Sequence, residues 1–343
     1  MLQKISRHRQ SIMGVAILWI LLHHSGLNLS GPLFAIKRSG FGGVEMFLFV
    51  SGFGCAISLM KNGDIPQFYG RRFRRLYPHY IPVMLAFLLM NLSGAGVLEW
   101  TRTVLGNLTG FTYWANVGLN FNWYIFGILA FYIMTPLFLE VLKKKGGWAV
   151  LLGLSFAAGF CFAGTDLRTC VSRLPIYVMG MMAGMRYKKD QEEEKTAAWK
   201  YACVFAVGVL GMVMLLGMYR FQDRIPEDLY IVFYPCILTT PAILTVCCLL
   251  FDALEKSAAG KWVNKFFSFL GSISLDLYLL HIVLYGRVGE WLEGQYDNTI
   301  PMAFSAKNLA IWLGVLAATI VVSKGYSLAV DWCMKKMSAR KQA

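Results

Sequence analysis

The chain has 343 residues, of which 57% are hydrophobic and only 15% are charged, and its formal net charge is +14. Its mean hydropathy of +0.53 is unlike that of a soluble globular domain, so the composition excludes that class and indicates a membrane protein.

Apolar stretches of the length that a transmembrane helix needs recur along the whole chain. We expect ten of them, at about 11–29, 43–60, 79–97, 123–142, 147–164, 173–187, 200–218, 231–250, 266–285 and 308–330.

The distribution of Lys and Arg predicts the orientation. If the N-terminus is cytoplasmic, 23 of the 33 basic residues fall in the inside segments 1–10, 61–78, 143–146, 186–200, 251–265 and 331–343. Basic residues accumulate in cytoplasmic segments, so we expect an all-α, polytopic membrane protein of about ten transmembrane helices with both termini in the cytoplasm. The same bias accounts for the net charge, and no nucleic-acid partner is expected.

We expect a single integral-membrane domain over residues 1–343, with no cleavable signal peptide and no appended soluble domain. Most of the eight cysteines lie inside apolar stretches, and none of them form a CxxC pair. Neither a disulfide framework nor a metal site is therefore expected.

The first apolar stretch contains two adjacent histidines, His23 and His24. Ionisable groups in hydrocarbon are costly, and imidazole can carry protons near neutral pH, so we expect at least one of the pair to be functional. Adjacent helical positions differ by about 100°, so we expect only one of them to face a given cavity. The alternative is a pair of buried, hydrogen-bonded histidines.

The second stretch begins at GGVEMFLFVSGFG, and its Glu45 lies at the same end of the bundle as His24. A carboxylate beside an imidazole can orient it for general-base work. The alternative is an interfacial carboxylate. Ser51, Gly52 and Gly54 fit close helix packing.

A basic segment, FYGRRFRRLYPHY, follows at 68–80, where we expect a cytoplasmic loop. Guanidinium groups grip phosphate in a bidentate manner, so the cluster favours a phosphate-bearing ligand over a plain anchor to anionic lipid. Its arginines are Arg71, Arg72, Arg74 and Arg75.

Aromatic residues are dense in the outside segment 111–124, which ends in Trp123 and Tyr124. Such residues usually form an interfacial belt, and a platform for stacking a sugar is the less common alternative. Arg168 and Arg173 flank the next outside loop and could hold a carboxylate or a carbonyl group; the alternative is surface charge.

The ninth stretch contains LGSISLDLYLLHIVLY, in which Ser274, Tyr278 and His281 share one helix face. That stripe is either part of a site or a seam of interhelical hydrogen bonds. Asp276 lies off the stripe and needs a partner if it is buried.

Five motifs in this order resemble those of the acyltransferase 3 family of integral-membrane acyltransferases. They are GVAILWILLHH, GVEMFLFVSGF, RRFRRLYPHY, NWYIFGILAFYIMTPLF and SISLDLYLLH. The resemblance extends over nearly the whole chain. The resemblance implies transfer of an acyl group, usually acetyl from acetyl-CoA, to a hydroxyl of a cell-envelope glycan or lipid-linked sugar. It implies the inner (plasma) membrane of a bacterium, with acyl-CoA as a co-substrate and no permanently bound cofactor.

The resemblance also implies residue roles. His24 would be the general base or the acyl acceptor, with Glu45 positioning it. Arg71, Arg72 and Arg75 would hold the phosphates of acyl-CoA. The groups that would contact substrate or support the oxyanion are Ser51, Trp123, Tyr124, Arg168, Tyr278 and His281.

Two positions depart from the family pattern. The family commonly has Arg where this chain has Met13, and Asp where it has Gln10, so we expect the inner end of the first helix to lack its usual charges. Donor binding would then rely on the basic segment, or the acyl donor would differ.

Two other classes of function remain open. Ten helices with intramembrane His, Glu and Asp would also fit a proton-coupled transporter or flippase of an envelope precursor. The change at Met13 also leaves open an inactive relative with a structural role in an envelope complex. No feature of the sequence identifies the acceptor or the acyl length.

Overall fold

The computed structural model describes residues 1–27, 29–162, 164–190, 198–226, 229, 231–293 and 305–340. Within these ranges the regular structure is entirely helical, which confirms the predicted all-α class. The first half comprises α1 (Leu2–Arg7), α2 (Arg9–His23), α3 (Gly31–Arg38), η1 (Ser39–Phe41), α4 (Gly42–Asn62), α5 (Ile65–Asn91), α6 (Val97–Thr109), α7 (Phe111–Trp114) and α8 (Trp123–Lys143). The second half comprises α9 (Gly147–Cys161), α10 (Arg168–Val171), α11 (Leu174–Asp190), α12 (Ala198–Arg220), η2 (Gln222–Arg224), α13 (Tyr234–Leu254), α14 (Ala258–Ser272), α15 (Ser274–Glu293) and α16 (Ala306–Arg340).

Several helices are long and apolar enough to cross a bilayer. Five stretches of the described residues meet this test, or six if the bent pair α14 and α15 counts as one span. They are Gly31–Asn62, Trp123–Lys143, Ala198–Arg220, Tyr234–Leu254 and Ala306–Ala339. A multi-pass membrane protein is therefore supported, whereas the count of about ten spans is not confirmed.

The first and fifth predicted spans correspond to helices shorter than a bilayer requires. Helix α2 has 15 residues and ends at His23, although we expected the span to continue to residue 29. Helix α9 also has 15 residues. An α-helix rises about 1.5 Å per residue, so 15 residues fall short of a hydrocarbon core of about 30 Å.

Close helix packing depends on glycines at two interfaces. A Cβ atom added at Gly52 of α4 would meet the carbonyl oxygen of Tyr177 in α11, and one added at Gly180 of α11 would meet that of Phe49. Likewise, a Cβ atom added at Gly14 of α2 would meet the carbonyl oxygen of Phe267 in α14. Small residues let helix backbones approach closely, so these contacts set the positions of α2 and α4.

The ninth predicted span is broken. Helices α14 and α15 meet at Ile273 with a bend of 69°. The hydroxyl groups on both sides of the break donate to nearby carbonyl oxygens, Ser272 to Phe269 and Ser274 to Gly271. Such local side-chain bonds compete with a continuous helical ladder. The break turns the α15 residues toward the bundle interior.

The basic segment 68–80 is helical, which corrects the expectation of a loop. Asp64 caps α5 by accepting the backbone N–H of Gln67 at 2.8 Å, and Pro66 lies in the first turn. Both features are typical of a helix start. The arginines therefore project from a regular helix, which fixes their spacing.

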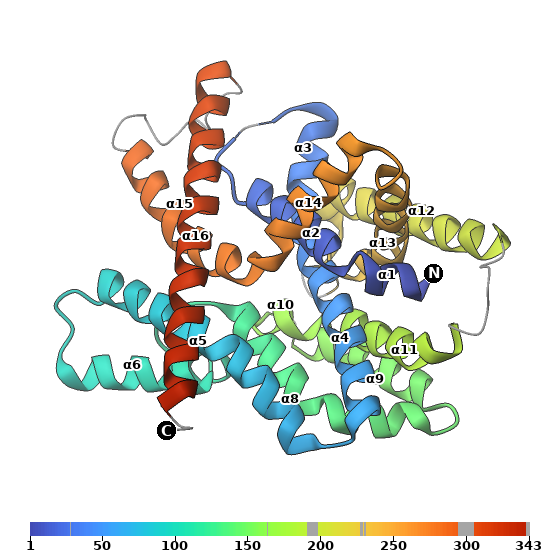
Figure 1. The fold of residues 1–343 in the computed structure, drawn as a ribbon, viewed down its shortest axis with the longest axis horizontal. Helices are drawn as coiled ribbons and strands as arrows, with labels where there is room; N and C mark the ends of the chain where they lie inside the picture. The colour runs from blue at the N-terminus through green and yellow to red at the C-terminus, as the bar shows by residue number, and fades with distance from the viewer. Residues whose placement is uncertain are drawn as a thin grey trace.

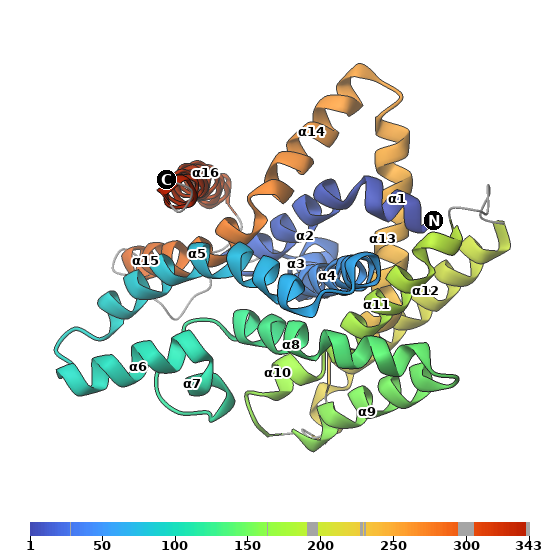
Figure 2. The same ribbon diagram turned by 60° about the horizontal axis from the view of Figure 1, so that its bottom comes forward.

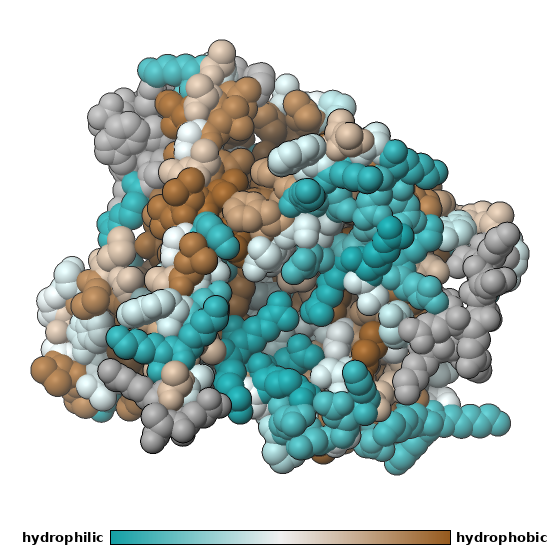
Figure 3. All heavy atoms as spheres, in the orientation of Figure 1, coloured by the Kyte–Doolittle hydropathy of each residue, from teal (hydrophilic) through white to brown (hydrophobic). Residues whose placement is uncertain are grey.

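The helices are arranged around α4, which runs through the middle of the molecule (Figure 1). Helix α16 stands at the edge, packs against α15 and α5, and is seen nearly end-on in Figure 2. On the face drawn in Figure 3, hydrophobic residues gather over the upper parts of α15 and α16, and hydrophilic ones over α1, α14 and the lower end of α4.

Ion pairs tie α1 to α13. Lys4 Nζ lies 2.5 Å from Asp252 Oδ2, and His8 Nε2 lies 2.7 Å from Asp252 Oδ1. The hydrogen bond to Asp252 raises the pKa of Lys4 above its ordinary value of 10.5, so its ammonium group stays charged. These pairs fix the chain immediately before α2.

Candidate active site

A cavity of about 980 Å³ lies beside the C-terminal end of α2. We call it the histidine cavity because His23, His24 and His281 line it, together with Trp123 and Arg173. The two adjacent histidines thus share one cavity, and the expectation that only one of them would do so is wrong. Helix α2 ends at His23, so the cavity passes around the end of the helix and reaches both rings.

A chain of hydrogen bonds sets the tautomer of His24. His281 Nδ1 lies 3.2 Å from the carbonyl oxygen of Leu277, which can only accept, so Nδ1 of His281 carries the proton. In the neutral ring, Nε2 of His281 then accepts from Nδ1 of His24 at 3.1 Å. The Nε2 atom of His24 is left with a free lone pair. His24 is exposed at the cavity, whereas His281 is buried, so the free nitrogen belongs to the accessible ring.

His23 is held differently. Its Nδ1 atom donates to the carbonyl oxygen of Lys37 at 3.0 Å, which connects the end of α2 to α3. Its ring meets that of His24 edge-on, with centroids 5.0 Å apart. This geometry fits a neighbour that supports His24.

Glu45 pairs with a different residue from the one expected. Its Oε1 atom accepts from Nε of Arg173 at 2.7 Å, and both side chains are buried. The Arg173 guanidinium lies over the rings of Phe233, at 3.5 Å, and Trp123, at 4.7 Å. Glu45 therefore fixes Arg173 at the wall of the histidine cavity, and the positioning of His24 falls to His281.

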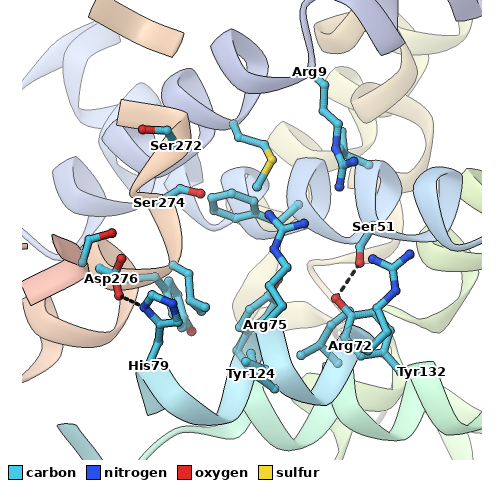
Figure 4. Close-up of a pocket in the computed structure, with 18 of the residues that line it drawn as sticks. Arg9, Ser51, Arg72, Arg75, His79, Tyr124, Tyr132, Ser272, Ser274 and Asp276 are labelled. Carbon is cyan, nitrogen blue, oxygen red and sulfur yellow. Dashed lines mark hydrogen bonds and ion pairs between the residues drawn. The ribbon is translucent and has the colours of Figure 1, made fainter. Parts of the chain in front are cut away.

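A second cavity, of about 200 Å³, contains the cationic residues. We call it the arginine cavity because Arg9, Arg72 and Arg75 line it (Figure 4). Arg72 stacks over Tyr132, at 5.5 Å, and the guanidinium groups of Arg9 and Arg75 have no carboxylate partner within 4 Å among the described residues. Unneutralised guanidinium groups facing one small cavity favour an anionic ligand.

Arg9 was not anticipated from the sequence. It lies one turn before Met13 on the same face of α2, and both side chains line the arginine cavity. A Cβ atom added at Gly54 would come within 3.4 Å of Arg9 Nη1, so this glycine leaves room for the guanidinium. The expectation that the inner end of this helix lacks charge is therefore wrong, because Arg9 supplies it from the preceding turn.

Arg71 lies outside the arginine cavity, unlike its neighbours Arg72 and Arg75. Its guanidinium bonds to the Gln67 side chain, one turn earlier, and to the Ser58 hydroxyl. These local bonds hold it at the surface, so the geometry gives it no part in the cavity.

One turn after Arg75, α5 carries His79, which meets a carboxylate of α15 at the arginine cavity (Figure 4). His79 Nδ1 lies 2.6 Å from Oδ1 of Asp276, which provides the partner that a buried Asp276 needs. The hydroxyl of Tyr326 also donates to the backbone carbonyl of His79 at 2.6 Å. Helices α15 and α16 thus both hold this part of α5 in place.

Tyr278 lines both cavities and so lies at the boundary between them. The predicted stripe of α15 runs along this path: Ser274 lines the arginine cavity and His281 the histidine cavity. The Tyr278 ring packs on that of Tyr124, with centroids 4.9 Å apart. The stripe therefore connects the cationic residues with the exposed imidazole.

The remaining predicted residues divide between the two cavities. Ser51 and Tyr124 line the arginine cavity, where the Ser51 hydroxyl lies 3.0 Å from that of Tyr132. Trp123 lines the histidine cavity, and Arg168, in α10, lines neither.

Asn122 was also missed, although the sequence carried a signal for it. It directly precedes the Trp–Tyr helix α8, a position where asparagine is a favoured N-cap, and it lines the histidine cavity. The sequence signals for Arg9 and His79 were weaker. Arg9 is an arginine just before an apolar run, and His79 is a histidine that follows a proline.

Comparisons with known proteins bear on this geometry. The relative "Regulator of hypoxia-inducible factor 1" of Caenorhabditis elegans is 28% identical over 192 residues, which cover 43% of this chain and 38% of that protein. The chain thus matches well under half of that relative's length. No solved structure matches the chain.

The family described as "Acyltransferase domain" (Acyl_transf_3) matches residues 13–325, nearly the whole chain. The match includes His24, Arg72, Arg75 and the α15 stripe that joins the two cavities. The chain therefore belongs to the Acyl_transf_3 family and is a membrane acyltransferase.

Proposed function

We propose that this protein moves an acyl group, usually acetyl, from acyl-CoA to a hydroxyl of a cell-envelope glycan or lipid-linked sugar. The observation that carries the proposal is the pair of cavities that meet at Tyr278, one cationic and one containing an accessible imidazole with a free Nε2. A donor with a charged head and a long thin arm would use both cavities.

The arginine cavity is suited to the donor. Acyl-CoA carries several phosphates, which Arg9, Arg72 and Arg75 would bind, and its pantetheine arm is narrow enough to pass between helices. The arm would lie along α15 past Ser274 and bring the thioester to the boundary at Tyr278. The small cavity volume of about 200 Å³ fits the arm rather than a bulky sugar.

The histidine cavity is suited to the acceptor. Its volume of about 980 Å³ accommodates a sugar, and aromatic side chains, Trp123 and Tyr113 among them, line it. His24 Nε2 would remove the proton from the acceptor hydroxyl as its oxygen attacks the thioester carbonyl carbon. The carbon–sulfur bond then breaks, the sulfur takes the electron pair, and His24 returns the proton to it.

The proposal includes a topology. With ten membrane passages and both termini in the cytoplasm, the arginine cavity opens to cytoplasmic acyl-CoA and the histidine cavity to the outer side. The short helix α2 and the broken pair α14 and α15 would then be passages that are shielded by neighbouring helices instead of by lipid. The membrane would be the inner (plasma) membrane of a bacterium.

A proton-coupled transporter or flippase of an envelope precursor is the rival proposal. The intramembrane His79–Asp276 pair favours it, because carriers use such pairs as proton relays. The unneutralised guanidinium groups of Arg9 and Arg75 have no role in that scheme, so we prefer acyl transfer.

The experiment is donor turnover by the purified protein in lipid vesicles. Acyl transfer predicts release of free CoA thiol from acetyl-CoA that depends on an acceptor sugar, together with thermal stabilisation by CoA. Uptake of an envelope precursor driven by a proton gradient, without thiol release, would favour the carrier and contradict our proposal.

A further inference from the structure

Asn122 carries a buried amide nitrogen that lacks a hydrogen-bond partner among the described residues. The residue is 2% exposed, and its Nδ2 atom bonds to no side chain or backbone group in the part of the chain that the structure describes. A buried donor without a partner destabilises the fold, because it has lost its hydrogen bonds to water. Such a group calls for an explanation, and a role in binding a substrate is one.

The orientation of this amide is fixed by its oxygen. Oδ1 accepts the backbone N–H of Tyr124 at 3.0 Å, the N-cap bond of α8, and lies 3.4 Å from the hydroxyl of Tyr278. The backbone N–H of Tyr124 can only donate, so exchanging the oxygen and nitrogen of the amide would place an N–H against an N–H. Nδ2 therefore stays unpaired while Oδ1 is used.

The location of Asn122 relates it to the reaction. It lines the histidine cavity with His24, and its oxygen is bonded to Tyr278 at the boundary with the arginine cavity. The acyl thioester of the proposed donor must come to this boundary for His24 to deliver the acceptor oxygen to it. The unpaired amide is thus at the place where negative charge develops on the carbonyl oxygen.

We propose that Nδ2 of Asn122 donates a hydrogen bond to the oxyanion formed when the acceptor oxygen adds to the thioester carbonyl. The new carbon–oxygen bond forms as the carbonyl π electrons move to oxygen, and the amide stabilises that charge. The carbonyl then re-forms as the carbon–sulfur bond breaks. This assignment rests on the proposed acyl transfer.

Two features make Asn122 better suited to this role than the donors expected from the sequence. The Ser51 hydroxyl bonds to Tyr132 in the other cavity, and His281 already uses both ring nitrogens. A donor fixed by a helix cap needs no rearrangement in the transition state, which is the condition for strong electrostatic stabilisation.

The test uses Asn122→Asp, which keeps the cap acceptor for Tyr124 and replaces only the Nδ2 donor with an oxygen. We expect kcat for transfer from acetyl-CoA to fall about 100-fold or more, the loss seen when one oxyanion donor is removed, while KM for acetyl-CoA is unchanged. Asn122→Ser, which also keeps a capping oxygen, removes the donor without adding charge and should show the same loss.

Two controls separate this role from a structural one. Asn116→Asp adds the same charge six residues away, at an exposed side chain that lines neither cavity, and should keep kcat near the wild-type value. The thermal midpoint of Asn122→Ser should stay near that of the wild type, because its cap remains.

Wild-type kcat in both Asn122 variants, or a loss confined to KM, would overturn the assignment and leave acyl transfer intact. Absence of acyl transfer by the wild type would instead refute the proposed function, and the assignment with it.

Discussion

At the scale of single residues, the site depends on partners that are distant in the sequence. His24 bonds to His281, 257 positions away, and Glu45 to Arg173, 128 positions away. The motifs identified the residue types, but their spacing could not show which side chains meet. The expected pairing of His24 with Glu45 was wrong because the buried guanidinium of Arg173 takes the carboxylate instead.

The chain of hydrogen bonds that sets the tautomer of His24 gives a first prediction. His281→Leu removes the acceptor for His24 Nδ1–H, so the proton can move to Nε2 and block the base. We expect kcat to fall about 10- to 100-fold, which is less than the full contribution of a general base. Steady-state kinetics at saturating acyl-CoA measures this, and an unchanged kcat would show that His281 does not set the tautomer.

The buried ion pair gives a second prediction, on stability. Arg173→Ala leaves the Glu45 carboxylate buried without a counter-charge, which should lower the free energy of unfolding by about 3–5 kcal/mol. The double variant with Glu45→Gln should recover part of that loss. Thermal unfolding in detergent measures both, and equal midpoints for the single and double variants would contradict the coupling.

At the scale of helices, the apolar pattern predicted where helices occur better than where they break. Each of the ten apolar stretches overlaps a helix, but the stretch 266–285 is divided at Ile273. Hydropathy does not predict this break, because serine hydroxyls and close backbone packing produce it. The charge of segment 68–80 favours a loop, whereas Asp64 and Pro66 are sequence signals for the helix start that the structure shows.

Close packing between α4 and α11 gives a third prediction. Gly180→Ala places a methyl group against the carbonyl oxygen of Phe49 and should cost about 1–3 kcal/mol of stability. Gly153→Ala in α9 is the matched control, because nothing lies within 4 Å of its added Cβ atom. We expect that control to be neutral or slightly stabilising in thermal unfolding. Equal losses in both would contradict the packing argument.

The inner end of α2 gives a fourth prediction. Arg9→Ala should raise KM for acyl-CoA about 10-fold or more and leave KM for the acceptor unchanged, since hydrogen bonds to charged groups contribute about 1.5–3 kcal/mol. Met13→Arg in that background should restore part of the affinity from the next turn. Arg71→Ala is the control, and an effect as large as that of Arg9→Ala would contradict the assignment.

At the scale of the whole molecule, the helices place the guanidinium groups and the imidazole in two cavities whose walls share Tyr278. Composition and motifs were sufficient to predict an all-helical membrane acyltransferase. They could not predict two cavities that meet at Tyr278, because the walls combine α2, α5, α8 and α15.

The proposed topology gives a fifth prediction, which three exposed cysteines make accessible. Cys161 should lie at the outer side, and Cys203 and Cys333 at the cytoplasmic side. In single-cysteine variants, a membrane-impermeant maleimide added to intact cells should label Cys161 and should label the other two only after permeabilisation. Labelling of Cys333 in intact cells would contradict a cytoplasmic C-terminus.

The central claim is that His24 carries out acyl transfer. The most direct measurement is mass spectrometry of envelope glycans from a deletion strain complemented with the wild type, with His24→Ala, or with His23→Ala at matched membrane levels. We expect the acyl mass increment to return with the wild type, to stay absent with His24→Ala, and to return at least in part with His23→Ala. An acyl increment restored by His24→Ala would contradict the account.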